Sequence, residues 1–189
     1  MEADWEFEIC ADAVDLAAPV IEAHWSGFVD LRLSPERAWD LPETVQFPAL
    51  GVALAKLNSG DSLVWTSKCD VWPHLEREAF DPDELDAPPG RAAHAMGCYI
   101  DLLPRKTWRS PDIAATDCNR VCKLLRAVPI RCCRADLVIR RAFIFPDLMD
   151  LGVTAYLTSC GESSAQAAQT FQAALMAFTN VLCAHSTLE

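Results

Sequence analysis

The fold of this protein is decided by residues 131–159, RCCRADLVIRRAFIFPDLMDLGVTAYLTS. In the first half of this stretch apolar residues such as Leu137 and Ile139 occupy odd positions, while charged residues such as Arg134 and Arg140 occupy even positions. A period of two is typical of a strand with one buried face and one exposed face. The stretch therefore predicts a long strand and, across a turn, its antiparallel hairpin partner.

Helix signals stand on both sides of this hairpin. Ser110 is followed by a proline and an acid, a pattern typical of a helix start, and predicts a helix that ends near Ala127. Ser163 and Gln166 fit a capping box, which predicts a second helix that ends near Cys183. The other predicted elements are a helix at 48–57, strands near 5–9, 20–32 and 63–72, and a strand within 92–103, where a helix is the alternative.

These elements follow one another as strand, strand, helix, three times over. The order predicts an α+β fold with a single twisted, mainly antiparallel sheet of about six strands and with helices on one face. A ferredoxin-like βαββαβ core is an alternative interpretation of the same elements. We expect residues 1–187 to form one domain, and residues 188–189 to be the remnant of a tag.

Charge is distributed unevenly along the chain. The net charge is −11, yet 10 of the 16 Lys and Arg residues lie in residues 105–141, which hold three acids. The net negative charge argues against binding to nucleic acid or to an anionic membrane surface. The basic segment indicates an anion site, a surface for a partner subunit or an internal counter-charge.

Cysteine usage and the first residues bear on the compartment. None of the nine cysteines belongs to a CxxC motif, so we expect reduced and mostly buried thiols, with no metal site and no cofactor. The first six residues are acidic where a secretory signal needs basic ones, and no apolar run approaches a membrane span. A cytoplasmic protein that does not enter the membrane is therefore predicted.

If helices cover one face of the sheet, the other face is polar and its members follow from the alternation. Arginine forks and a lysine on this face favour a small anionic ligand, with two carboxylates as orienting groups. Ordinary cross-strand ion pairs are the alternative interpretation. The candidate ligand-binding residues are Lys68, Asp70, Arg134, Asp136, Arg140 and Tyr156.

Cys160 is a separate candidate, as a reactive thiol. It stands between a predicted strand and the capped helix at 163–183, where the positive end of the helix dipole lowers a thiol pKa. His24, His74 or His94 would be the base for such a nucleophile. No family signature surrounds it, and burial of an inert thiol is the alternative.

The predicted terminal helix has no charged residue between 165 and 184. Its polar side carries glutamines and alanines where a solvated helix usually carries Lys and Glu. Charge is depleted in the cores of protein interfaces, so this helix predicts a homodimer formed through residues 163–183.

No motif decides the reaction or the ligand, and three hypotheses remain open. The first is a non-enzymatic module that binds a ligand or a protein, with an anion-binding polar sheet face. The second is an enzyme of unknown reaction that uses the polar face or Cys160. The third is an acidic inhibitor or immunity-type protein for a basic partner.

Overall fold

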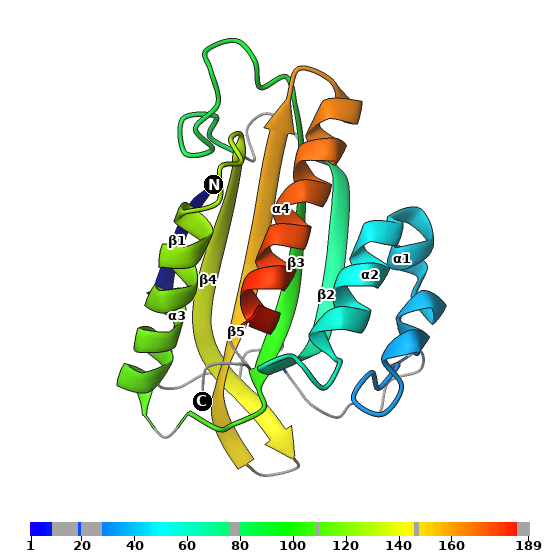
Figure 1. Ribbon diagram of the computed structural model, residues 1–189, viewed down its shortest axis with the longest axis vertical. Helices are drawn as coiled ribbons and strands as arrows, with labels where there is room; N and C mark the ends of the chain where they lie inside the picture. Colours follow the sequence, from blue (N-terminus) through cyan, green and yellow to red (C-terminus); the bar gives the residue numbers. More distant parts are fainter. Residues whose placement is uncertain (9–18, 20–27, 76–79, 109, 146–147, 185–189) are drawn as a thin grey trace.

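The computed structural model describes residues 1–8, 19, 28–75, 80–108, 110–145 and 148–184. Within these described residues, five strands form one mixed sheet in the order β1-β4-β5-β3-β2 (Figure 1). The strands are β1 (Glu2–Phe7), β2 (Val64–Leu75), β3 (His94–Pro104), β4 (Cys133–Phe145) and β5 (Leu148–Gly161). The helices are η1 (Pro35–Asp40), α1 (Pro42–Gln46), α2 (Pro48–Leu57), α3 (Pro111–Arg126) and α4 (Ser164–Ala184).

The α+β class and the dominance of antiparallel pairing are confirmed, but the strand count is not. The strand expected at 20–32 falls largely outside the described residues, and residues 28–32 form no strand. The sheet is also mixed, because β1 pairs in parallel with β4 at one edge. The ferredoxin-like order needed a strand at 20–32 and is not supported. Instead, the hairpins β2–β3 and β4–β5 meet through β3 and β5.

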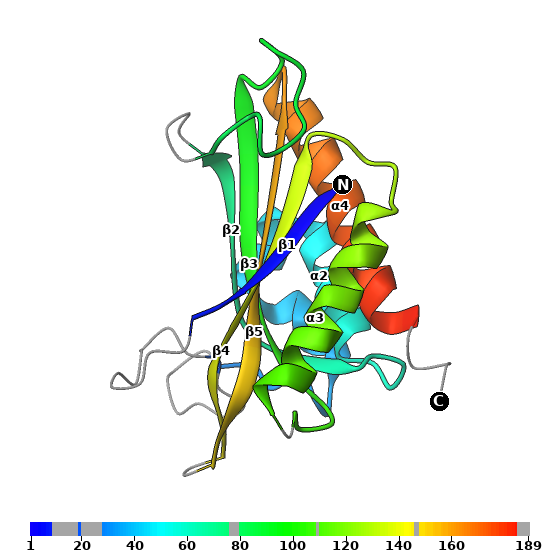
Figure 2. The ribbon, with the colours of Figure 1, turned by 90° about the vertical axis from the view of Figure 1, so that its left-hand side faces the viewer.

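The helices α2, α3 and α4 lie on the same face of the sheet (Figure 2). α4 is in the middle of this layer, where it packs on β5 and β3 and contacts α2 on one side and α3 on the other (Figure 1). Its buried side includes the fully buried Phe171 and Phe178. The uncharged sequence of α4 suits this central position. The homodimer through residues 163–183 stays a prediction.

The predicted helix starts are confirmed by their caps. Ser110 Oγ accepts a hydrogen bond from the backbone N–H of Ile113, 3.4 Å away. Ser163 Oγ accepts from the N–H of Gln166 at 3.2 Å, and Gln166 Oε1 accepts in return from the N–H of Glu162 at 2.9 Å. These local bonds satisfy N–H groups that have no partner within the helix.

A β-bulge changes the expected alternation in β2. Thr66 lies opposite Leu102, whereas Cys69 lies opposite Ile100, so β2 has one more residue than β3 between these pairs. As a result Trp65, expected in the core under the helices, packs instead against Leu103 and Ala142 on the other face. We call this other face, opposite α2, α3 and α4, the outer face.

Candidate functional site

The six predicted ligand-binding residues all lie on the outer face. The strand register places Asp136 of β4 beside Tyr156 of β5, and Tyr99 of β3 between Tyr156 and Asp70 of β2. Arg134 and Arg140 occupy the same face of β4 two and four residues from Asp136. Lys68 joins them through a contact with Asp101. Whether these residues bind a ligand stays a prediction.

Each cation of this set already has an acidic partner. Arg134 Nε donates to Asp136 Oδ1 at 2.7 Å. Arg140 forms an ion pair with Glu8 and also donates to the Tyr156 hydroxyl at 3.3 Å. The Arg134–Asp136 pair lies within β4, and the Arg140–Glu8 pair joins β4 to the segment that follows β1. Such ion pairs agree with the alternative interpretation, and they leave little net positive charge for an anion.

Asp101 completes the group, although sequence reasoning did not select it. This carboxyl is 1% exposed, accepts from Thr154 Oγ1 at 2.7 Å and lies 3.6 Å from Lys68 Nζ. Burial raises the pKa of Asp101, and burial likewise raises the pKa of Asp136 despite its bond to Arg134. An acid inside an otherwise apolar run, Tyr99–Leu103, was the signal that could have found it.

Cys160 lies beneath the loop that follows β2. The thiol is fully buried, with Leu85, Ala87 and Ala95 in the same apolar cluster. Burial, reinforced by the neighbouring Cys132, raises the pKa of Cys160 to about 12, so the thiolate is scarcely populated at neutral pH. The described surroundings therefore lend no support to a nucleophilic role.

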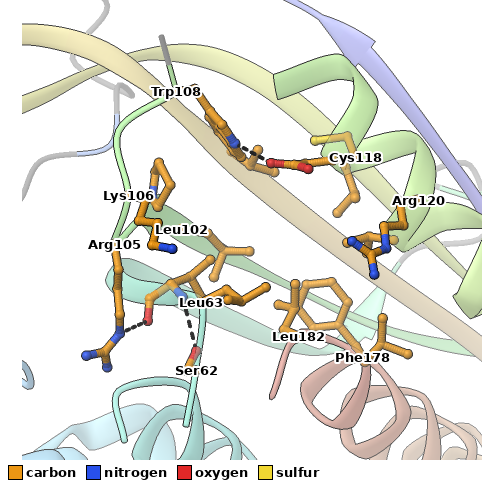
Figure 3. Close-up of a pocket in the computed structure, with 17 residues that line it drawn as sticks. Ser62, Leu63, Leu102, Arg105, Lys106, Trp108, Cys118, Arg120, Phe178 and Leu182 are labelled. Carbon is orange, nitrogen blue, oxygen red and sulfur yellow. Dashed lines mark hydrogen bonds between the residues drawn. The ribbon is translucent and has the colours of Figure 1, made fainter. Parts of the chain in front are cut away.

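A cavity of about 420 Å³ opens on the other side of the sheet, between α3 and α4 (Figure 3). Its volume lies within the usual range for small-molecule sites. β4 and β5 pass beneath the space between these two helices (Figure 1). Sequence reasoning missed this pocket. The sheet and α4 supply its buried apolar floor, made of Leu102, Leu137, Val153 and Phe178.

The mouth of the pocket is rich in basic side chains. Arg105 and Lys106 lie on one side and Arg120 of α3 lies on the other (Figure 3). The one carboxylate among the described lining residues is Asp117, which accepts from Trp108 Nε1 at 2.8 Å. Three cations and one carboxylate leave the mouth with a positive charge.

Arg105 is held in place without being neutralised. Its Nη2 donates to the carbonyls of Asn58 and Ser59 at 2.9 and 2.6 Å, and its Nε donates to the carbonyl of Val64 at 3.2 Å. The guanidinium also stacks over Trp65, 5.1 Å from the ring centroid. Because these partners are uncharged, the positive charge of Arg105 persists at the pocket.

Arg120 is exposed and, among the described residues, forms no ion pair. Cys118, two residues earlier along α3, is 3% exposed and lines the pocket. Burial raises the pKa of Cys118 to about 12, so this thiol is protonated at neutral pH. The pocket thus combines an inert apolar interior with a positive mouth, an arrangement suited to binding an amphipathic anion.

The comparisons with known proteins yield no match: no family model, no curated protein and no solved structure resembles the chain significantly. The described part of the chain contains no cluster of His, Cys, Asp or Glu side chains arranged to hold a metal ion. None of the helices in that part is both long and apolar enough to cross a membrane.

Proposed function

We propose that this protein is a non-enzymatic ligand-binding module whose pocket between α3 and α4 takes a small molecule with an apolar body and an anionic group. The observation that carries the proposal is the pairing of an apolar floor with a mouth where Arg105, Lys106 and Arg120 outnumber Asp117. Apolar walls with a few placed polar groups are typical of small-molecule sites.

The outer face is the weaker candidate for an anion. Arg134 and Arg140 are matched there by Asp136 and Glu8, whereas the charge of Arg105 at the pocket is met by neutral carbonyl groups. An enzymatic role has less support than binding, because Cys118 and Cys160 are both buried and protonated.

The proposal is tested by thermal shift with octanoate, decanoate, dodecanoate and naphthoate, each beside the alcohol with the same apolar body. We expect the carboxylates to raise Tm more than the alcohols, since a ligand stabilises the folded state by mass action. Arg120→Glu is expected to abolish the preference for carboxylates. Lys123→Glu is the matched control, because Lys123 is exposed on the same helix but does not line the pocket.

A second pair of variants tests the location of the ligand. Val121→Phe fills the pocket from α3, and we expect it to reduce the shift caused by every ligand. Val52→Phe introduces the same side chain at an exposed site on α2 and should leave the shifts unchanged. Shifts that survive both Arg120→Glu and Val121→Phe would show that the pocket is not the binding site.

A further inference from the structure

We propose that the outer face of the sheet is a docking surface for a basic protein partner, one whose contact surface is rich in arginine and lysine. This surface lies on the opposite side of the sheet from the pocket between α3 and α4. The inference therefore stands or falls independently of the proposed ligand.

Charge is the first observation. The parallel register places Glu2, Asp4 and Glu6 of β1 on the same face as Arg134 and Asp136 of β4. All three acids are exposed. The described residues of the outer face carry eight carboxylates against three cations, a formal charge of −5. The acids are Glu2, Asp4, Glu6, Glu8, Asp70, Asp101, Asp136 and Asp150, and the cations are Lys68, Arg134 and Arg140.

Much of this negative charge is not compensated within the described chain. Glu2 and Glu6 form no ion pair with any described residue. Asp4 forms an ion pair with Arg126 of α3 at 3.5 Å. The outer face keeps a net negative charge even when Arg126 is included in the sum. Glu84, in the loop beyond β2, adds to the negative potential that Arg134 and Asp136 experience.

A row of aromatic rings crosses the same face and is the second observation. Trp72 of β2 lies 5.8 Å from Tyr99 of β3, and Tyr99 lies 6.4 Å from Tyr156 of β5, measured between ring centroids. The Arg140 guanidinium lies 5.9 Å from the Tyr156 ring. Ring faces attract cations, and Trp72 is 36% exposed, so a partner's arginine can stack on it as Arg140 stacks on Tyr156.

The buried groups beneath the row support the same partner. Asp101 Oδ2 is buried and accepts no hydrogen bond, and its ion pair with Lys68 is 3.6 Å long. The pKa values of Asp101 and Asp136 are raised because burial makes the ionised carboxylate unfavourable. At Asp136 the negative charges of Glu84 and Asp4 raise the pKa further. Cations brought by a partner lower that cost.

The extent of the surface argues for a macromolecular occupant. The acids and rings extend from β1 at one edge to β2 at the other, about 19 Å for five strands at the usual spacing. A small cation contacts few of these groups at once. An arginine-rich segment lying across the strands contacts many, with charge complementarity that also speeds association.

The test measures binding of a fluorescein-labelled nona-arginine peptide by anisotropy, with a nona-glutamate peptide as the probe of opposite charge. We expect nona-arginine alone to bind, and its affinity to fall as salt is added because exposed charges are screened. The Glu2→Lys, Glu6→Lys double variant should weaken binding roughly tenfold. The Glu36→Lys, Asp61→Lys double variant changes the net charge equally at exposed sites outside the face, and should weaken binding less than about twofold.

Trp72→Ala provides a second test at the other edge of the sheet and does not depend on β1 folding with two new lysines. It should weaken binding severalfold while leaving the far-ultraviolet circular dichroism unchanged. Equal losses in the two double variants would reduce the interaction to net charge and overturn the proposal. The proposal would also be overturned if nona-arginine did not bind. Unchanged affinity in both the Trp72→Ala variant and the Glu2→Lys, Glu6→Lys double variant would overturn it as well.

Discussion

The pocket between α3 and α4 and the outer face lie on opposite sides of one sheet and carry opposite charges. Leu137 belongs to the pocket floor, and its neighbour Asp136 belongs to the acidic outer face. Because successive side chains of a strand point to opposite faces of the sheet, adjacent residues contribute to the apolar pocket on one face and to the acidic surface on the other. The net charge of −11 conceals this division, since it averages a positive mouth with a negative surface.

The largest effect is expected from Phe178, which is fully buried in the core and lines the pocket. Phe178→Ala should cost about 3–5 kcal/mol of unfolding free energy and should enlarge the pocket, so that bulkier aromatic carboxylates raise Tm more than in the parent protein. Urea denaturation and thermal shift measure the two effects.

Phe171→Ala is the matched control for this experiment. Phe171 is also fully buried in α4, but it packs against Phe47 and does not line the pocket. We expect a similar loss of stability with no change in ligand preference. A change in preference in both variants would mean that the pocket is not the part of the molecule that selects the ligand.

The carboxyl groups of Asp101 and Asp136 on the outer face should produce a smaller effect, a dependence of the free energy of unfolding on pH. The folded-state pKa values of Asp101 and Asp136 are raised above the ordinary value of 3.8, so ionising these groups costs stability as pH rises from about 3.8 through their folded pKa values. The Asp101→Asn, Asp136→Asn double variant lacks this loss. Its stability relative to the parent should therefore increase with pH in denaturation experiments.

Asp30 gives the control of opposite sign. Its hydrogen bonds from Arg32 lower the pKa of Asp30, so the stability it contributes is present above pH 3.8 and is lost as pH falls through the lower folded pKa. Asp30→Asn should therefore be destabilising near neutral pH and nearly neutral in acid. The same trend in both variants would contradict our account of the outer face.

The smallest effect concerns the loop over Cys160. Arg131 forms an exposed ion pair with Asp86 in this loop, so Arg131→Ala should leave global stability almost unchanged. It should nevertheless increase alkylation of Cys160 by iodoacetamide, read by mass spectrometry, because the loop opens more often. Arg37→Ala breaks another exposed pair, with Asp40, and should not alter labelling of Cys160.

Local signals in the sequence were sufficient for the helices and for the hairpin. The bounds of α2 match the predicted helix at 48–57, and the starts of α3 and α4 follow from side chains that cap their own backbone. The bulge in β2 was missed because the extra residue has no distinctive composition. It reversed the faces of Trp65 and Thr66 while Lys68 and Asp70 kept theirs.

The pocket could not be predicted, because it depends on how two helices lie over a sheet. Arg105 directly follows β3 whereas Arg120 belongs to α3, yet the two residues lie on opposite sides of one opening (Figure 3). The basic segment 105–141 did indicate where anion-binding groups would come from. The alternation argument directed attention to Arg134 and Arg140, and nothing in the sequence revealed that acids from β1 would lie beside them.

The parallel pairing of β1 with β4 has a consequence for the order of folding. Glu2 lies beside Arg134, so the first strand finds its neighbour only after most of the chain has been synthesised. Contacts of such long sequence separation form late, because closing a long loop costs entropy before the contact compensates for it. β1 supplies three of the outer-face acids, so the complete acidic surface proposed for a basic partner exists only after β4 has been synthesised and β1 has paired with it.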